Sequence, residues 1–484
     1  MTTNDRAIIS SNRSRTGPKP EPAADPHQAA RSIATLQSSR WLIAFLVIEF
    51  GCQLALLSPS FSGFRIFIRT AAFATSLLLF LIPGKSVAPN PVRNVAIVCV
   101  LILVFSAFHP DTSNAVVAIA TVLLNLAILG PLFWVPRIRL DAAALRRVFL
   151  LVWAFQTASA ALSVLQIYFP GRFDPATSST LSEGTLQALQ ITLADGTRVF
   201  RPMGLTDTPG GSALGGMYSV LFAMALWLER PRFLFRIVLL LSMTVGLFAL
   251  YLCQIRSLLV MLIPSFITAA WSQMSRMRLR EVVAMVAPLA VTAIVAFIFA
   301  VAVGGDAVTG RLSTLIEADP QTVFYSNRGF FLEHTFTKLL PEYPLGAGLG
   351  RWGMIASYFN DGGNPASTPI WAEIQWTGWL IDGGIPLMIS WAVALFVAFR
   401  ATFAVAISKD ASLRAISTWA GILVGYSMGL IALMFNGCPF AGTLGIDFWL
   451  LNAALVTAAS QARLLGGDGL PQNQGVTRNV RRLT

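Results

Sequence analysis

Twelve apolar stretches, separated mostly by short basic segments, determine what this chain can fold into. Hydrophobic residues make up 55% of its 484 residues and charged residues only 12%, about half the share of an ordinary soluble protein. So few charges cannot cover a surface that faces water, and the mean hydropathy of +0.66 agrees. Helices satisfy their own backbone hydrogen bonds in lipid, and alternating barrel strands are absent from the pattern. The sequence therefore predicts an all-α, polytopic membrane helix bundle.

The stretches that we expect to form about twelve transmembrane helices fall at about 41–58, 64–82, 94–108, 114–135, 147–168, 211–228, 234–252, 256–272, 282–303, 374–398, 415–435 and 446–460. With twelve crossings both termini lie on one side. The segments on that side hold 25 of the 35 basic and 8 of the 23 acidic residues, a net charge of +17 against −5 elsewhere. Because cytoplasmic loops are enriched in Lys and Arg, we expect both termini in the cytoplasm. The basic excess therefore indicates topology, and no nucleic-acid partner is expected.

Composition divides the chain into three parts. Residues 1–40, rich in Ser, Pro, Ala and Arg, are expected to be a disordered cytoplasmic tail. Residues 41–460 form the transmembrane domain, and 461–484 a basic cytoplasmic tail. Two long connections, at about 169–210 and 304–373, fall on the outer side, and the second is expected to contain short helices. Any chemistry of the protein is therefore expected on the outer face.

Arginines on the outer side run against the positive-inside bias and are candidate binding residues. A guanidinium is a permanent cation whose planar fork binds phosphate oxygens two at a time, so several of them suit a lipid diphosphate at the membrane surface. The alternative is that an arginine snorkels to the lipid headgroups or pairs with a carboxylate, and this alternative is favoured for Arg65 and Arg69. The functional interpretation is favoured for Arg256, whose hairpin is nearly loopless. The candidates are Arg65, Arg69, Arg201, Arg256, Arg328 and Arg351.

Carboxylates supply a candidate proton acceptor. Glu373 opens the tenth stretch, and Asp382 follows nine residues later, about 180° around a helix, so only Glu373 is expected to point into an outer cavity. Glu49, in the middle of the first stretch, is either functional or a buried hydrogen-bonded residue. A disulfide between Cys253 and Cys438 stays open. The glycines of 346–350 predict a tight turn and not a nucleotide-binding loop, because no strand precedes them.

Five short motifs follow one another from Arg201 to about residue 385. They are an Arg-x-x-Gly segment at 201–204, the Arg256 hairpin, Asn327-Arg328 at the start of a loop helix, Pro-Leu-Gly-x-Gly-x-Gly at 344–350 and Asp-Gly-Gly-Ile at 382–385. Their order resembles the bacterial O-antigen ligase and O-antigen polymerase superfamily of membrane glycosyltransferases. The twelve stretches and the large outer loop before the tenth are also similar to that family.

The resemblance implies transfer of a glycan from a polyprenyl-diphosphate donor to a saccharide acceptor on the periplasmic face of the inner membrane. Arg256 and Arg328 would bind the diphosphate, and Glu373 would accept the proton of the attacking hydroxyl in an inverting reaction. No metal and no cofactor is expected, since arginines carry the charge. In ligases a His occupies the place of Glu373, which favours a polymerase of exopolysaccharide or O-antigen over a ligase to lipid A core. Expected partners are the lipid-linked glycan, the acceptor, membrane lipids, a flippase and a chain-length regulator.

Two other classes compete with this interpretation. Twelve spans also suit a transporter of lipid-linked glycans or small molecules, but such carriers often join two similar halves through a longer central loop. Here the central connection is only about 229–236, and the two halves differ in the size of their outer loops. The second alternative is a non-catalytic membrane subunit of an envelope assembly.

Overall fold

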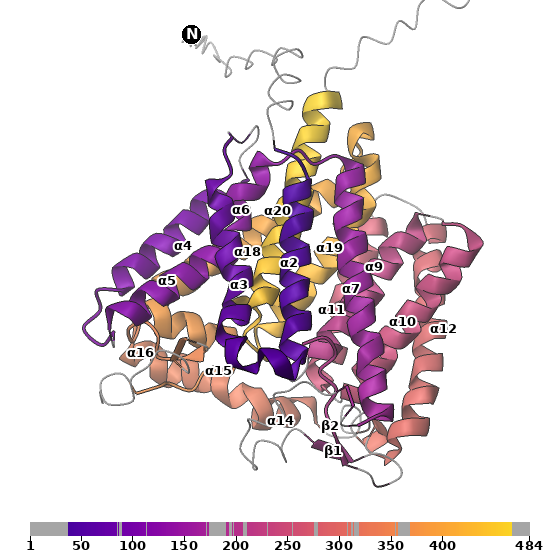
Figure 1. Cartoon of the computed structure of the whole chain (residues 1–484), viewed down its shortest axis with the longest axis horizontal. Helices are drawn as coiled ribbons and strands as arrows, with labels where there is room; N and C mark the ends of the chain where they lie inside the picture. The colour runs from indigo at the N-terminus through magenta and orange to yellow at the C-terminus, as the bar shows by residue number, and fades with distance from the viewer. Residues whose placement is uncertain are drawn as a thin grey trace, which may run out of the picture.

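The computed structural model describes residues 37–466 except for a set of gaps, at 85, 87–89, 113, 171, 174–189, 193–195, 197, 207–210, 230, 254, 275–278, 307, 311–312, 314–318, 354 and 357–367. The predicted terminal tails therefore lie almost wholly outside the described residues, as do parts of both predicted outer loops. The described chain is a helix bundle (Figure 1). The predicted helical class is confirmed.

Eight of the described helices are long and apolar enough to cross a membrane. They are α2 (Arg40–Leu57), α7 (Ala142–Tyr168), α9 (Gly211–Leu228), α10 (Phe233–Cys253), α12 (Leu279–Gly304), α18 (Gln375–Ala406), α19 (Arg414–Leu433) and α20 (Thr443–Gly466). Helices α5 (Ala115–Leu129) and α6 (Pro131–Trp134) form a pair bent by 47° that makes a ninth span if it is counted as one. The multi-pass membrane character is thus supported.

The remaining three predicted stretches are also helical but do not reach the same length and hydropathy. They correspond to α3 (Arg65–Leu78), α4 (Arg93–Ser106) and α11 (Arg256–Met274). The 14 residues of α3 or α4 extend only about 21 Å, less than the roughly 30 Å of a hydrocarbon core. The count of twelve crossings therefore stays a prediction.

Apolar side chains on the outside of the bundle identify the surface that meets lipid. Only 17% of the apolar window of α12 is buried within the protein, against 83% for α9. Exposed Val286, Ile294, Ile298 and Phe299 lie along α12, which runs along one edge of the molecule (Figure 1). An exposed face of this kind is stable only against another apolar phase. Helix α12 therefore lies at the lipid boundary, and α9 lies in the core.

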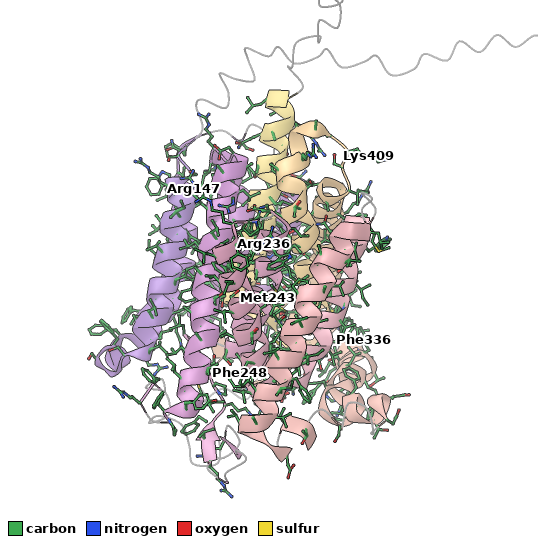
Figure 2. The ribbon with its side chains drawn as sticks, turned by 90° about the vertical axis from the view of Figure 1, so that its right-hand side faces the viewer. Arg147, Arg236, Met243, Phe248, Phe336 and Lys409 are labelled. Atoms are coloured by element: carbon green, nitrogen blue, oxygen red, sulfur yellow. The ribbon has the colours of Figure 1, made fainter. Side chains whose placement is uncertain are left out.

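The two ends of the bundle differ in what they carry. Helix α2 begins and α20 ends at one end, whereas the loop helices α14 (Pro320–Phe324) and α15 (Phe330–His334) lie at the other (Figure 1). Arg147, Arg236 and Lys409 are on the half of the bundle where α20 ends, and Phe336 is on the opposite half (Figure 2). The basic short connections therefore gather at one end, and the parts of the long connections that are described gather at the other.

Outside the spans, the described chain contains short elements. A two-stranded antiparallel hairpin, which the sequence did not predict, pairs β1 (Gln190–Thr192) with β2 (Arg198–Phe200). The other short elements are the 3-10 turns η1 (Pro59–Phe64), η2 (Leu79–Leu81), η3 (Val135–Arg137), η8 (Ala411–Leu413) and η9 (Pro439–Ala441), the π-turns η5 (Tyr325–Gly329) and η6 (Thr335–Leu339), and α16 (Leu340–Glu342).

Two of the five motifs pack directly against each other. Helix α18 is kinked at Gly383 and Gly384, whose backbone angles are not helical. The predicted glycine turn closes this kink, because Ala347 N–H donates to the Ile381 carbonyl at 2.8 Å and Ile385 N–H donates to the Pro344 carbonyl at 2.9 Å. The turn predicted at 346–350 is thereby confirmed, and its position explains why both segments are rich in glycine.

Gly384→Ala should lower the thermal stability of the purified protein by on the order of 1–3 kcal/mol. Gly384 has a φ of +64°, and an added Cβ would lie 2.3 Å from the Pro344 carbonyl oxygen. Gly353 is the matched control, since its φ of +66° is almost the same but no atom lies within 4 Å of an added Cβ. Melting curves in detergent should show a clearly larger loss for Gly384→Ala than for Gly353→Ala. Equal losses would mean that the contact between the turn and the kink does not stabilise the fold.

Candidate functional site

Arg328 lies on a loop helix that runs from residue 320 to residue 342, built from the consecutive elements α14, η5, α15, η6 and α16. Asp319 caps its start, because the Asp319 carboxylate accepts from Thr322 N–H at 2.9 Å and from the Thr322 hydroxyl at 2.7 Å. The predicted start at Asn327 is therefore too late. Arg328 instead lies inside the π-turn η5, a local widening of the helix that is frequent at functional sites.

The carboxylate of Glu373 forms an ion pair with the guanidinium of Arg328. The second carboxylate oxygen of Glu373 accepts a hydrogen bond of 2.7 Å from the indole N–H of Trp371. The side chains of Arg328 and Glu373 are 36% and 22% exposed, so the pair is partly shielded and still open to solvent. The structure thus brings together two of the three predicted catalytic residues, which lie 45 positions apart in the sequence.

Glu373 does not lie on α18, contrary to the helical-wheel argument. Ile374 is extended, with φ −123° and ψ 150°, and α18 begins only at Gln375. Gln375 holds this junction in place: its N–H contacts the carbonyls of Met434 and Gly437 at 3.1 and 2.9 Å, and its side-chain oxygen accepts from Phe440 N–H at 2.9 Å. The position of Glu373 is therefore set by the connection between α19 and α20 and not by a helical period.

The same connection places Cys438 beside the ion pair. Burial raises the pKa of the Cys438 thiol to about 12, although the nearby Arg328 guanidinium acts to lower it. Burial likewise lowers the pKa of Arg328, but a guanidinium stays protonated at any physiological pH. Cys438 is therefore a neutral thiol at neutral pH. The open question of a disulfide is also answered, since Cys253 and Cys438 are both free.

A contact between hydroxyl groups joins the loop helix to the membrane bundle. The side chains of Thr335, on η6, and Thr377, in the first turn of α18, form a hydrogen bond of 2.5 Å. Thr335 is fully buried at this contact and lies seven residues, or about two helical turns, from Arg328. The loop helix is therefore attached to α18 at Thr335, which orients Arg328 towards Glu373.

The Arg-x-x-Gly segment packs against the C-terminal end of α10. Gln166 of α7 holds it, because its side-chain oxygen accepts from Met203 and Gly204 N–H, both at 2.9 Å. Gly204 has a φ of +65°, and an added Cβ would lie 2.5 Å from the hydroxyl of Ser159. The Pro202 carbonyl accepts from the Ser212 hydroxyl at 2.7 Å and also contacts the Cys253 thiol. These contacts explain the glycine of the motif and place Arg201 beside the end of α10.

Arg256 begins α11 three residues after Cys253. Its side chain lies outside the described part of the chain, so its predicted contact with the diphosphate stays a prediction. Arg201 lies close enough to Cys253 for its charge to act on that thiol. The Arg-x-x-Gly motif therefore lies beside the end of α10 that leads into the Arg256 hairpin.

Arg351 lies where a structural role explains its contacts. It is only 8% exposed, its Nε donates to the Thr368 carbonyl at 3.2 Å and its Nη1 to the Ala347 carbonyl at 3.0 Å. The second contact holds the glycine turn and the first ties it to the segment that precedes α18, so nothing in this geometry favours the predicted role in substrate binding. Arg65 and Arg69 lie on the first turns of α3, and both take part in interactions within the protein, so their predicted role stays a prediction.

Sequence reasoning missed three features of this region. Trp371, Cys438 and Thr335 contact or orient the ion pair, and nothing in their local sequence marks them.

Asp382, which was set aside as facing away, lines a cavity of about 30 Å³ together with Asn125, Gln375, Trp352 and Trp379. One oxygen of Asp382 has no hydrogen-bond partner among the described residues, and this volume is sufficient for water to hydrate it.

A comparison of this chain with protein-family models and with curated proteins finds no significant match.

Proposed function

We propose that this chain is an inner-membrane glycan polymerase that acts on the periplasmic face, with both termini in the cytoplasm. It would transfer a glycan from a polyprenyl-diphosphate donor to a saccharide acceptor, in exopolysaccharide or O-antigen polymerisation. The observation that carries the proposal is the Arg328–Glu373 pair, a cation and a base held together at the loop helix, whose elements α14 and α15 lie at the end of the bundle opposite the start of α2 and the end of α20. The resemblance of the motifs supplies the substrate class.

The pair can perform both halves of an inverting transfer. The acceptor hydroxyl attacks the anomeric carbon of the donor sugar, and its proton passes to the Glu373 carboxylate. The bond between that carbon and the diphosphate oxygen breaks, and the electron pair leaves with the polyprenyl diphosphate. Arg328, joined by Arg256, stabilises the charge that develops on this leaving group, which is worth several kcal/mol in a shielded site. The donor diphosphate would attract the Arg328 guanidinium and so release the carboxylate to act as base.

The position of Glu373 also favours a polymerase over a ligase to lipid A core. In the resemblance, ligases carry a His where this chain has Glu373. A carboxylate paired with an arginine is ionised, so it is ready to accept the proton of the acceptor hydroxyl when the reaction starts. The ligase assignment stays the alternative within the same class of enzyme.

Purified protein in detergent should lengthen native lipid-linked glycans extracted from cells that produce it, without any ion gradient. A transferase needs only its two substrates, whereas a carrier changes the side of the membrane on which a glycan lies and not its length. Gel analysis of released glycans measures chain length directly. If lengths stay unchanged while liposomes containing the protein move the glycan across the bilayer, the transporter alternative is correct and the polymerase proposal is wrong.

A further inference from the structure

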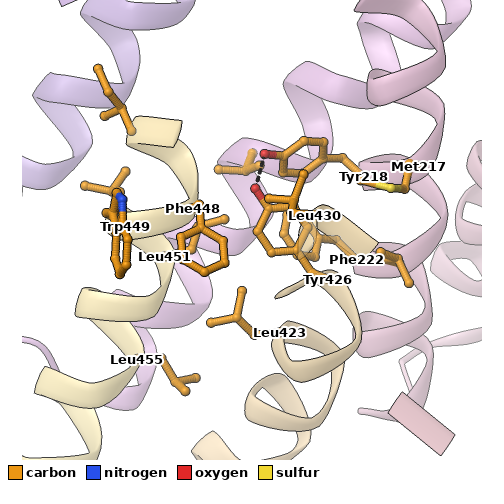
Figure 3. Packing of buried hydrophobic residues seen from close by; sticks show 14 of the residues in the cluster. Met217, Tyr218, Phe222, Leu423, Tyr426, Leu430, Phe448, Trp449, Leu451 and Leu455 are labelled. Atoms are coloured by element: carbon orange, nitrogen blue, oxygen red, sulfur yellow. Dashed lines mark hydrogen bonds between the residues drawn. The ribbon is translucent and has the colours of Figure 1, made fainter. Parts of the chain in front are cut away.

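Four ionisable side chains meet in the apolar core of the bundle, away from the Arg328–Glu373 site. Glu49 comes from α2, Tyr218 from α9, Tyr426 from α19 and Asp447 from α20. Glu49 is 1% and Asp447 4% exposed, and both tyrosines are buried. Around the tyrosines the neighbours are Phe222, Leu430, Phe448 and other apolar side chains (Figure 3). Burying such polar groups among apolar side chains costs free energy unless they form hydrogen bonds with one another.

The hydroxyl groups form a directed chain that ends on Asp447. The Tyr218 and Tyr426 hydroxyls are hydrogen-bonded to each other, as Figure 3 shows, and the Tyr218 hydroxyl also donates to Asp447 Oδ2 at 3.4 Å. Each phenol has one proton to donate. Since Tyr218 gives its proton to Asp447, Tyr426 must donate to Tyr218. The chain therefore presents a donor to Asp447, which favours a carboxylate there.

Glu49 and Asp447 are close neighbours in this cluster, and their carboxyl groups lie near enough to act on each other. Neither oxygen of Glu49, nor Oδ1 of Asp447, meets a donor from any other described residue. Two carboxylates cannot bond to each other, because neither carries a proton. A hydrogen bond between them requires one proton.

No described basic side chain offsets the charge of this pair. The ionisable groups that act on Glu49 and Asp447 are these two acids and the two tyrosines, with Cys52 one turn from Glu49. Two adjacent negative charges without a cation are strongly unfavourable in the interior of a membrane protein. Binding of a single proton removes one of them and supplies the missing hydrogen bond.

We propose that Glu49 and Asp447 form an intramembrane proton-binding site, in which Glu49 carries the proton and donates it to Asp447, while the Tyr426–Tyr218 chain donates to Asp447 from the other side. The bound proton links α2, the first described helix, to α20, the last. Loss of this proton would leave two adjacent negative charges in the core with no described basic side chain to offset them. The proposal does not depend on glycan transfer.

Infrared spectroscopy of the purified protein in lipid nanodiscs tests the site without any activity assay. At pH 8 the difference between wild type and Glu49→Gln should contain the carbonyl band of one protonated carboxyl group, which shifts in D₂O. The Gln amide can still donate to Asp447, so the fold should be kept. In Asp447→Asn the Glu49 band should remain but move, because its acceptor changes from a carboxylate to an amide.

Glu229→Gln is the matched control. Both oxygens of Glu229 are used by donors, the Arg146 guanidinium at 2.8 Å and the Trp419 indole at 2.9 Å, so its replacement should remove no protonated-carboxyl band. Absence of the band from the wild-type minus Glu49→Gln difference would overturn the proposal, as would an Asp447→Asn spectrum with an unmoved band. The spectra should also be the same in sodium and choline buffers. A Glu49 band that appears only without sodium would show that the pair binds a metal cation and not a proton.

Discussion

Glu373→Gln is expected to lower the rate of glycan elongation by about 10²–10⁴-fold, the usual contribution of a general base. The amide has nearly the shape of the carboxylate, and its oxygen can still accept the hydrogen bond from Trp371. It cannot accept the proton of the acceptor hydroxyl. The measurement is the length and rate of polymer synthesis in cells, together with the amount of unused lipid-linked repeats, which should accumulate.

Glu333→Gln serves as the control for this substitution. Glu333 is an exposed carboxylate on the same loop helix, where it interacts with Tyr325, and its replacement should leave elongation unchanged. If Glu373 only pairs with Arg328 to hold the loop helix, Glu373→Gln would reduce thermal stability and keep most activity. Polymer of normal length at the normal rate would therefore exclude Glu373 as the base, although a binding site built on the arginines could survive that result.

Hydropathy was sufficient to locate the membrane helices in the sequence. All twelve apolar stretches are helical in the described chain, because a continuous run of apolar residues has no other stable backbone in lipid. Whether a short helix such as α4 crosses the membrane depends on tilt and on its neighbours, which a local pattern does not contain. The glycine turn was also predictable, since positive φ at Gly346, Gly348 and Gly350 is a local property.

The candidate site was only partly predictable, and the failures have a common cause. Glu373 was placed on a helix because the tenth apolar stretch begins beside it, but contacts of Gln375 with Met434 and Phe440 delay the start of α18. Arg351 was taken as a phosphate ligand because it is an outer arginine, whereas its donors are used by backbone carbonyls. Both failures have this cause: the contacts that decide the outcome join residues distant in sequence, and a local pattern does not contain them.

The Glu49–Asp447 pair was also only partly predictable from the sequence. Sequence reasoning marked Glu49 as either functional or hydrogen-bonded, and could not name its partner. The partner lies on the last helix of the bundle, and the tyrosines that complete the cluster come from two further helices. No periodicity connects four helices, so only the tertiary structure could bring these groups together.

Arg328→Ala is expected to reduce elongation by about 10²–10³-fold, the usual cost of removing one preorganised donor to a developing negative charge. Arg328→Lys keeps the charge and loses the planar fork, so it should recover only part of that activity. Lys338→Ala is the control, because Lys338 is an exposed cation on η6, in the same loop helix. The apparent KM for the lipid-linked donor and kcat should both be measured, since a diphosphate ligand affects binding as well as the chemical step.

A double substitution separates catalysis from a structural ion pair. If Arg328 only neutralises Glu373, removal of both charges in Arg328→Ala with Glu373→Gln should restore activity relative to Arg328→Ala alone, because no unpaired carboxylate remains in the partly shielded site. If Arg328 binds the leaving diphosphate while Glu373 accepts the proton, the double variant has lost both functions and should be no more active than the weaker single variant. Recovery of activity in the double variant would contradict the proposed roles of both residues at once.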